Sequence, residues 1–185
     1  MEHIVTFTGE EFTPLDPDVN QIHIEDIAHS LSLLCRANGH MDYFFSIAQH
    51  SINCAYEAKA RSYPARLQLA CLIHDASEAY LSDITRPVKR YLPEYIEIEK
   101  RLQDVIYSKY PGIIETEEDF ILIDKIDNDM LIHEFNVLMS KRTKTLELPP
   151  LYSTPSFKYR EHTEVETEFL KMYYGIIHAG MIQGR

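Results

Sequence analysis

Four side chains that can bind a divalent metal ion stand apart from the other polar residues of the sequence. His74 and Asp75 are adjacent, in a segment whose other residues are mostly apolar or small. His50 precedes them, Asp127 follows them, and each lies among apolar residues. Polar side chains are costly to bury unless a hydrogen bond or a cation satisfies them. Two imidazoles and two carboxylates form a mixed donor set that suits Mn, Co, Ni, Fe(II) or Zn.

Helices must position these residues, because apolar side chains recur at three and four residues along most of the chain. The pattern predicts six main helices, at about 24–37, 43–60, 64–81, 96–110, 116–139 and 163–179. We expect His50 on the second helix, His74 and Asp75 inside the third, and Asp127 on the fifth. Three helices then converge on one site.

The fold class that follows is all-α, a single compact helical bundle over residues 1–185. Prolines at 14 and 17 predict an irregular arm over 1–21, in which Glu2 to Thr8 can form a short strand. Three further prolines predict a surface loop over 141–161. The sequence contains no internal repeat and no low-complexity tract.

Composition excludes several classes of protein. A formal net charge of -11 repels polyphosphate backbones, so we expect no long nucleic acid as a partner, although a local cation can still hold a small anion. Three cysteines without CxxC spacing favour a reducing, cytoplasmic location. The start of the chain lacks an apolar signal segment, and no stretch approaches the ~18 apolar residues of a membrane span.

The four donors and their neighbours resemble the H...HD...D signature of the HD phosphohydrolase superfamily. The segment from Leu72 to Glu78 is similar to the HDASE segment of its 5'-deoxynucleotidase branch. Similar motifs flank it, namely Leu15-Asp16-Pro17, Ile24 to Ala28, Cys35-Arg36, Gly39-His40, Ala48 to Ser51, Ser82-Asp83-Ile84 and Pro87-Val88-Lys89. The resemblance covers about residues 6–135 and extends to small phage and bacterial HD phosphohydrolases, including that of oxetanocin biosynthesis.

The resemblance implies an HD-domain bundle and a metal-dependent phosphohydrolase. The expected reaction removes phosphate from small nucleotides, either nucleoside mono-, di- or triphosphates, and favours deoxynucleotides or analogues. The attacking group is metal-activated water. Binuclear members supply extra histidines between the HD pair and the final Asp, and this chain has none between residues 75 and 127, so we expect one ion, with Mg also possible. Asp124, one turn before Asp127, is a rival fourth ligand.

Other residues gain roles beside the metal. Glu78 follows His74 by four residues and Asp75 by three, so on a helix it shares their side and can orient water or transfer a proton. Donors to phosphate oxygens are expected at Arg36, His40 and Lys89. The resemblance implies that Asp83 accepts from a sugar hydroxyl. In deoxynucleotidases of this group a Trp often follows the Arg, whereas here Ala37 does. Analogy with such folds allows a homodimer.

Three other functions remain open. A guanosine tetraphosphate 3'-pyrophosphohydrolase resembles HDxxED after its metal pair, whereas Ala79 follows Glu78 here. A catalytically silent nucleotide-binding module would keep the scaffold without the need for all four donors. An interaction scaffold would use the tyrosine-rich tail, which contains Tyr152, Tyr159, Tyr173 and Tyr174.

Overall fold

Helices dominate the computed structural model, which describes residues 3–141 and 146–181. Within these residues there are six helices of eight residues or more: α1 (Ile24–Leu33), α2 (Ile47–Ala60), α3 (Ala65–Leu72), α6 (Pro93–Ser108), α7 (Glu117–Leu138) and α8 (His162–Ile176). Two helices of four residues, α4 (Glu78–Leu81) and α5 (Arg86–Lys89), complete the set, and a π-helical turn over Ile177–Met181 follows α8. The predicted all-α class with six main helices is confirmed. No helix in the described ranges is long and apolar enough to cross a bilayer.

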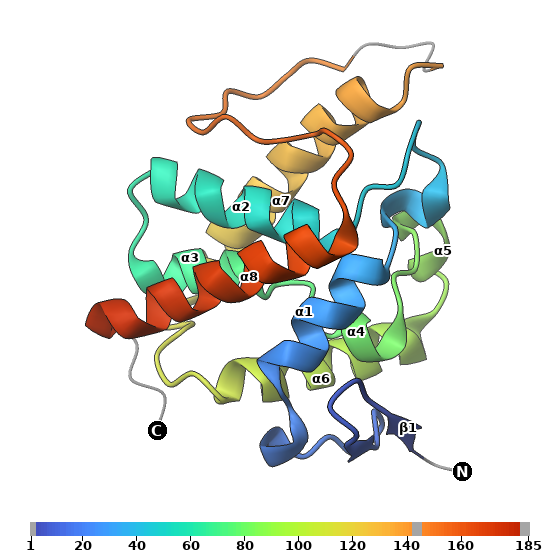
Figure 1. The fold of residues 1–185 in the computed structure, drawn as a ribbon, viewed down its shortest axis with the longest axis vertical. Coiled ribbons are helices and arrows are strands. Elements are labelled where there is room, and N and C mark those ends of the chain that lie inside the picture. Colours follow the sequence, from blue (N-terminus) through green and yellow to red (C-terminus); the bar gives the residue numbers. More distant parts are fainter. Residues whose placement is uncertain (1–2, 142–145, 182–185) are drawn as a thin grey trace.

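Helix α2 lies at the centre of the bundle. It packs against α1, α3, α7 and α8, and Figure 1 shows it enclosed between α7 and α8. Nearly every side chain from Ile47 to Ala58 is consequently buried, polar ones included. His50 has an exposed fraction of 0%. A polar residue at this depth requires a partner, and the partners of His50 define the candidate site described below.

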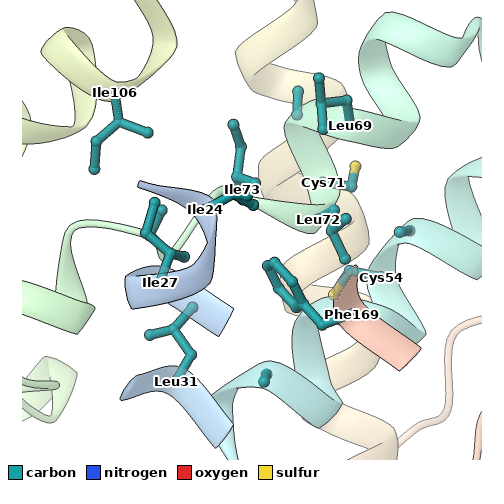
Figure 2. Close-up of a cluster of buried hydrophobic side chains, with 14 of the residues drawn as sticks. Ile24, Ile27, Leu31, Cys54, Leu69, Cys71, Leu72, Ile73, Ile106 and Phe169 are labelled. Carbon is teal, nitrogen blue, oxygen red and sulfur yellow. The ribbon is translucent and has the colours of Figure 1, made fainter. Parts of the chain in front are cut away.

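The hydrophobic core joins helices that are far apart in the sequence. Figure 2 shows Ile24, Ile27 and Leu31 of α1 facing side chains of α3, among them Leu72, with Phe169 of α8 beside them. These three residues of α1 recur at three and four positions, as the sequence pattern predicts for one helical face. The same core holds α2 and α3 side by side, and these two helices carry or precede both histidines of the site.

Helix α1 ends earlier than predicted, at Leu33 and not at Asn38. The next residues are extended and pair with the segment before α2, with Cys35 opposite Ser46. A turn over 36–39 follows, in which Ala37, Asn38 and Gly39 all have positive φ. Backbone pairing with a segment ten residues later therefore replaces the last helical turn, and it brings Arg36 into the interior.

The first 21 residues carry more structure than an irregular arm. Ile4–Val5 (β1) pairs antiparallel with Glu11–Phe12 (β2), with Ile4 opposite Phe12. A 3-10 helix follows over Val19–Gln21. Phe12 is completely buried, and its ring lies 4.3 Å from that of Tyr80. Met1 and Glu2 lie outside the described residues.

The segment expected as a surface loop, 141–161, crosses the outside of α2 (Figure 1). Its residues 142–145 lie outside the described part. The remainder has neither helix nor strand, and its backbone is held by three buried polar side chains on one stripe of α2. Gln49 donates to the carbonyl oxygens of 156 and 158, Asn53 exchanges two hydrogen bonds with Ser156, and Glu57 accepts from the N–H groups of 152 and 153.

Asp119 stabilises the start of α7, where it accepts hydrogen bonds from the N–H groups of Glu115 and Thr116 and pairs with Arg66. We expect Asp119→Ala to lower the free energy of unfolding by about 1–2 kcal/mol at pH 7, because helix N-terminal donors lose their acceptor. The Arg66 hydrogen bond is the main reason that the pKa of Asp119 lies below its usual value in the folded protein.

The pH dependence of this difference has a definite sign. A carboxyl group with a lowered folded pKa contributes its full stability above its unfolded pKa of about 3.9. That contribution is lost as the pH falls through the folded pKa. Urea unfolding of both proteins between pH 7 and pH 3 should therefore show the difference shrinking toward acid. Glu118→Ala, at an exposed neighbouring position, is the control and should change little. A difference that grows toward acid would contradict this account.

Candidate metal centre

The pair His74 and Asp75 lies in a turn and not inside a helix, which corrects the predicted helix over 64–81. Helix α3 ends at Leu72, and tight turns lead to α4. The physical reason is the His74 side chain. Its Nδ1 lies 2.8 Å from the carbonyl oxygen of Cys71, which in a continuing helix would accept from the N–H of Asp75. The imidazole N–H takes the place of that backbone donor.

Gln103 of α6 supports the turn from outside. Its Nε2 donates to the carbonyl oxygen of Ile73 at 2.8 Å, and its Oε1 accepts from the N–H of Ser77 at 3.0 Å. The interrupted helix leaves the Ser77 N–H to this side chain, while the Ile73 carbonyl oxygen also accepts from the N–H of Ala76 at 3.1 Å. Two hydrogen bonds from one side chain thus set the orientation of the segment that carries His74 and Asp75. Gln103 was not among the predicted site residues, because its role depends on the turn.

The structure brings the four predicted donors together. Nε2 of His50 lies 3.3 Å from Nε2 of His74 and 3.1 Å from Oδ1 of Asp127. Oδ2 of Asp75 lies 3.3 Å from His74 Nε2 and 3.9 Å from His50 Nε2. Ligands held about 2.1 Å from one ion stand about 3.0 Å apart in adjacent octahedral positions and about 3.4 Å apart in a tetrahedron. The observed spacings therefore fit one ion.

The ring nitrogens show which atoms are free to bind it. Nδ1 of His74 donates to the Cys71 carbonyl, and Nδ1 of His50 lies 2.6 Å from Oε1 of the buried Glu134. With the hydrogens on both Nδ1 atoms, each Nε2 carries a lone pair. Two lone pairs facing each other at 3.3 Å repel unless a proton or a metal ion lies between them.

The charges of the side chains in the site also favour a bound cation. Asp75, Asp127 and Glu134 surround the buried guanidinium of Arg36, and the exposed guanidinium of Arg86 also contacts Asp127, so that three carboxylates face two cations and one negative charge remains uncompensated. Burial alone would lower the pKa of Arg36, but the three carboxylates raise it above its ordinary value. A divalent cation would neutralise the remaining charge. The donor set present thus fits a metal ion in both geometry and charge.

The titrating groups respond to this excess of negative charge. Burial would lower the pKa of His74, but the neighbouring carboxylates of Asp75 and Asp127 raise it to about 9. Asp127 shows the converse, because its two imidazole contacts outweigh burial and hold its pKa well below the usual value. In the absence of a metal ion, the site therefore attracts a proton.

A second set of possible metal ligands combines the same two imidazoles with a cysteine. Among the described residues, His50, Cys54 and His74 form a group whose ligand atoms all lie within 4.8 Å of one another. Cys54 was not among the predicted ligands, although it follows His50 by one helical turn. Its sulfur lies 3.5 Å from His50 Nε2. Burial raises the pKa of the thiol well above its ordinary value, whereas the pKa of Asp127 is held well below its usual value, so the thiol ionises less readily than that carboxyl group. The carboxylate of Asp127 is therefore a better anionic metal ligand than the Cys54 thiol at neutral pH.

A cleft of about 520 Å³ opens beside His74 and Asp75, and Glu78 and Lys89 line it. Glu78 is buried, and within the described ranges its Oε2 has no hydrogen-bond partner. Burial, reinforced by Asp75, raises the pKa of Glu78 well above its usual value. Lys89 Nζ pairs with Glu99 at 2.6 Å on the opposite wall. A larger hollow of about 930 Å³ lies between α2, α3 and α8 and contains none of the predicted site residues.

The other predicted residues lie at different distances from the centre. Arg36 is inside it, with its guanidinium directed at carboxylates. Asp83 is half-buried, and burial raises its pKa, with a further rise from the charge of Asp75 and an opposing effect from Arg36. His40 is exposed at the end of the 36–39 turn. Asp124 is exposed, and the described part of the chain shows no ion pair between it and either imidazole.

Arg86, at the start of α5, contacts Asp127 directly. Its Nη2 lies 2.5 Å from Asp127 Oδ2, while Asp127 Oδ1 faces His50. The Arg86 side chain is 58% exposed, so it is the accessible cation next to the proposed ligands, whereas Arg36 is enclosed. Pro87 directly follows Arg86, and the two residues begin α5.

Comparisons with known proteins place the chain near three relatives. It is 40% identical over 118 residues to the uncharacterized protein YfdR of Escherichia coli, covering 63% of this chain and 64% of the relative. It is 38% identical over 109 residues to an uncharacterized protein of Rhodobacter capsulatus, covering 56% and 55%. The chain thus spans somewhat over half the length of these two relatives. No protein-family model matches it.

The name of the third relative states an enzymatic activity. It is a 5'-deoxynucleotidase of Photobacterium profundum, 24% identical over 160 residues, and the match covers 66% of this chain and 81% of the relative. This similarity is distant. The chain is therefore a distant relative of a nucleotidase. Its own residues His50, Cys54 and His74 form a group that could hold a metal ion.

Proposed function

We propose that this protein is an HD-type, metal-dependent phosphohydrolase that removes phosphate from small nucleotides. One observation carries the proposal: two imidazole Nε2 atoms and two carboxylate oxygens meet at one point beside a cleft. The distant similarity to a 5'-deoxynucleotidase supports the choice of nucleotides as substrates. The proposed ligands are His50, His74, Asp75 and Asp127.

The chain's own residues would prepare the site for hydrolysis. When bound, a divalent ion lowers the pKa of water toward neutrality and polarises a phosphoryl oxygen. The Cys71 carbonyl and Glu134 keep the two imidazoles oriented with Nε2 toward the centre. Arg36 separates the negative charges of Asp75 and Glu134, with its nitrogens 3.3 Å from an oxygen of each. None of these residues has to move for the substrate to enter, because the cleft already borders His74 and Asp75.

Glu78 is the proposed proton donor. Its buried environment favours the neutral acid, and its unpartnered Oε2 belongs to a side chain that lines the cleft. A neutral carboxyl group at this place can protonate the oxygen of the leaving alcohol or phosphate, and the resulting carboxylate can then take up a proton from water. Glu78 was predicted to lie on the same helical side as the metal pair, whereas the structure places it at the start of α4, with its N–H bonded to the carbonyl oxygen of Asp75.

Substrate binding is proposed for residues around the cleft. Lys89 is directed into it and would exchange its contact with Glu99 for phosphate oxygens. The exposed guanidinium of Arg86 would supply a second donor from the side of Asp127. Asp83 is proposed to accept from a sugar hydroxyl. For Arg36, the carboxylate contacts favour an electrostatic role over direct phosphate binding, and His40 remains a proposed contact at the surface.

A nucleotide panel tests the function. Chelator-treated protein is supplied with Mn, Co, Zn or Mg and incubated with nucleoside mono-, di- and triphosphates, deoxynucleotides and guanosine tetraphosphate, and the released products are identified. We expect phosphate release that requires Mn or Co and stops when the chelator is added back. Release of diphosphate from guanosine tetraphosphate would favour the pyrophosphohydrolase alternative. Metal binding with no metal-stimulated release from any nucleotide would contradict the enzyme proposal and favour a silent binding module.

A further inference from the structure

Glu134 on α7 is a fully buried carboxylate that contacts two parts of the site at once. Its Oε1 lies 2.6 Å from Nδ1 of His50, and its Oε2 lies 3.3 Å from Nη2 of Arg36. The same Arg36 reaches Asp75 at 3.3 Å and Asp127 at 3.8 Å. Glu134 is therefore connected, directly or through one guanidinium, to three of the four proposed ligands, although it offers no atom to the ion itself.

We propose that Glu134 is a positioning residue that fixes the tautomer of His50 and thereby sets the affinity of the centre for its metal ion. The inference rests on the metal centre proposed above and adds a residue that the four-donor pattern does not contain. Carboxylates that accept the second N–H of a ligating histidine fix its ring and raise its basicity, and their loss commonly costs 10- to 100-fold in metal affinity.

The direction of the effect follows from donors and acceptors. A guanidinium can only donate, so the oxygen facing Arg36 must be an acceptor. Both oxygens of a carboxylate are acceptors, so the carboxylate form of Glu134 pairs with a His50 ring that carries hydrogen on Nδ1. In the neutral ring Nε2 then has no hydrogen, and this atom faces His74 Nε2 and Asp127. The carboxylate thus selects the one neutral tautomer that can bind metal at this point.

Glu134→Gln should favour the other neutral tautomer of His50, because the side chain keeps nearly the same shape but gains an NH₂ donor. The amide oxygen must face Arg36, because turning the NH₂ group toward the guanidinium would oppose donor to donor. The NH₂ group then faces Nδ1 of His50 and favours the tautomer with hydrogen on Nε2. That hydrogen occupies the position of the metal. We therefore expect the variant to bind Mn or Zn 10- to 100-fold more weakly than the wild type.

The measurement is the metal dissociation constant, obtained by competition with a chromogenic chelator and without nucleotide. The matched control is Glu57→Gln. Glu57 is equally buried on α2, but it accepts from Arg61 and from the 152–153 backbone and has no contact with the four donors. We expect it to lose stability and keep its metal affinity within about threefold of wild type. Circular dichroism and thermal unfolding show whether each variant is folded.

The outcomes separate the two proposals. Wild-type protein that binds no divalent metal would overturn the proposed function. Wild-type protein that binds metal while folded Glu134→Gln binds it equally tightly would overturn only the role of Glu134. If Glu134→Gln does not fold, ¹⁵N-histidine NMR of the zinc-loaded wild type decides. The inference predicts hydrogen on Nδ1 of His50 and zinc on Nε2, and the opposite assignment would contradict it.

Discussion

Replacement of His74 by Ala, or of Asp127 by Asn, is expected to remove bound metal and to reduce nucleotide hydrolysis by about 10³-fold or more. In the proposed centre, His74 would supply a nitrogen whose orientation is fixed by the Cys71 carbonyl. Asp127 would supply an oxygen, which lies 3.1 Å from His50 Nε2, and would neutralise part of the charge of the ion. Metal content after gel filtration and initial rates of phosphate release measure the two effects separately.

Asp124→Asn is the matched control for Asp127→Asn. Asp124 lies one helical turn earlier on α7, carries the same side chain and is exposed. We expect metal content unchanged and a rate within about twofold of wild type, as is usual for surface substitutions. Loss of metal in Asp124→Asn with retention in Asp127→Asn would move the fourth ligand to Asp124.

Glu78→Gln is expected to lower kcat by about 10²- to 10³-fold while leaving the metal dissociation constant unchanged. The amide has nearly the shape of the carboxyl group but cannot give up a proton to a leaving oxygen, and general acid catalysis is worth about this much. Rates at saturating nucleotide and saturating metal isolate kcat from binding.

Asp104→Asn serves as the control for Glu78→Gln. Asp104 also lines the cleft, but it is exposed on α6. We expect its kcat to stay within about twofold of wild type. A Glu78→Gln protein with wild-type kcat would show that the proton comes from elsewhere, whereas simultaneous loss of metal would make Glu78 part of the metal centre.

Local patterns predicted most of the helical framework. The apolar stripe Ile24, Ile27 and Leu31 indicated α1, and the predicted helix over 116–139 matches α7 to within one residue at each end. Such signals depend on residues three or four apart, which a sequence shows directly. The convergence of His50, His74, Asp75 and Asp127 was also predicted, because polar residues on otherwise apolar helical segments require partners.

Long-range hydrogen bonds decided the features that were missed. Helix α3 stops where the His74 ring contacts the Cys71 carbonyl, three residues earlier, and the turn that follows depends on Gln103, 30 residues after Ile73. Glu134 lies 84 residues from His50, and no local pattern links the two. One signal was nevertheless present: Glu134 occupies the stripe of α7 formed by Ile123, Ile126 and Met130, all of them buried. An acid on an apolar stripe indicates a buried partner.

Anomalous X-ray diffraction from crystals grown with Mn²⁺ or Zn²⁺ tests the central claim most directly. We predict one anomalous peak at about 2.0–2.3 Å from Nε2 of His50 and His74 and from one carboxylate oxygen each of Asp75 and Asp127. Absence of a peak at these residues, or a peak bound by the Cys54 sulfur with both carboxylates remote, would contradict it.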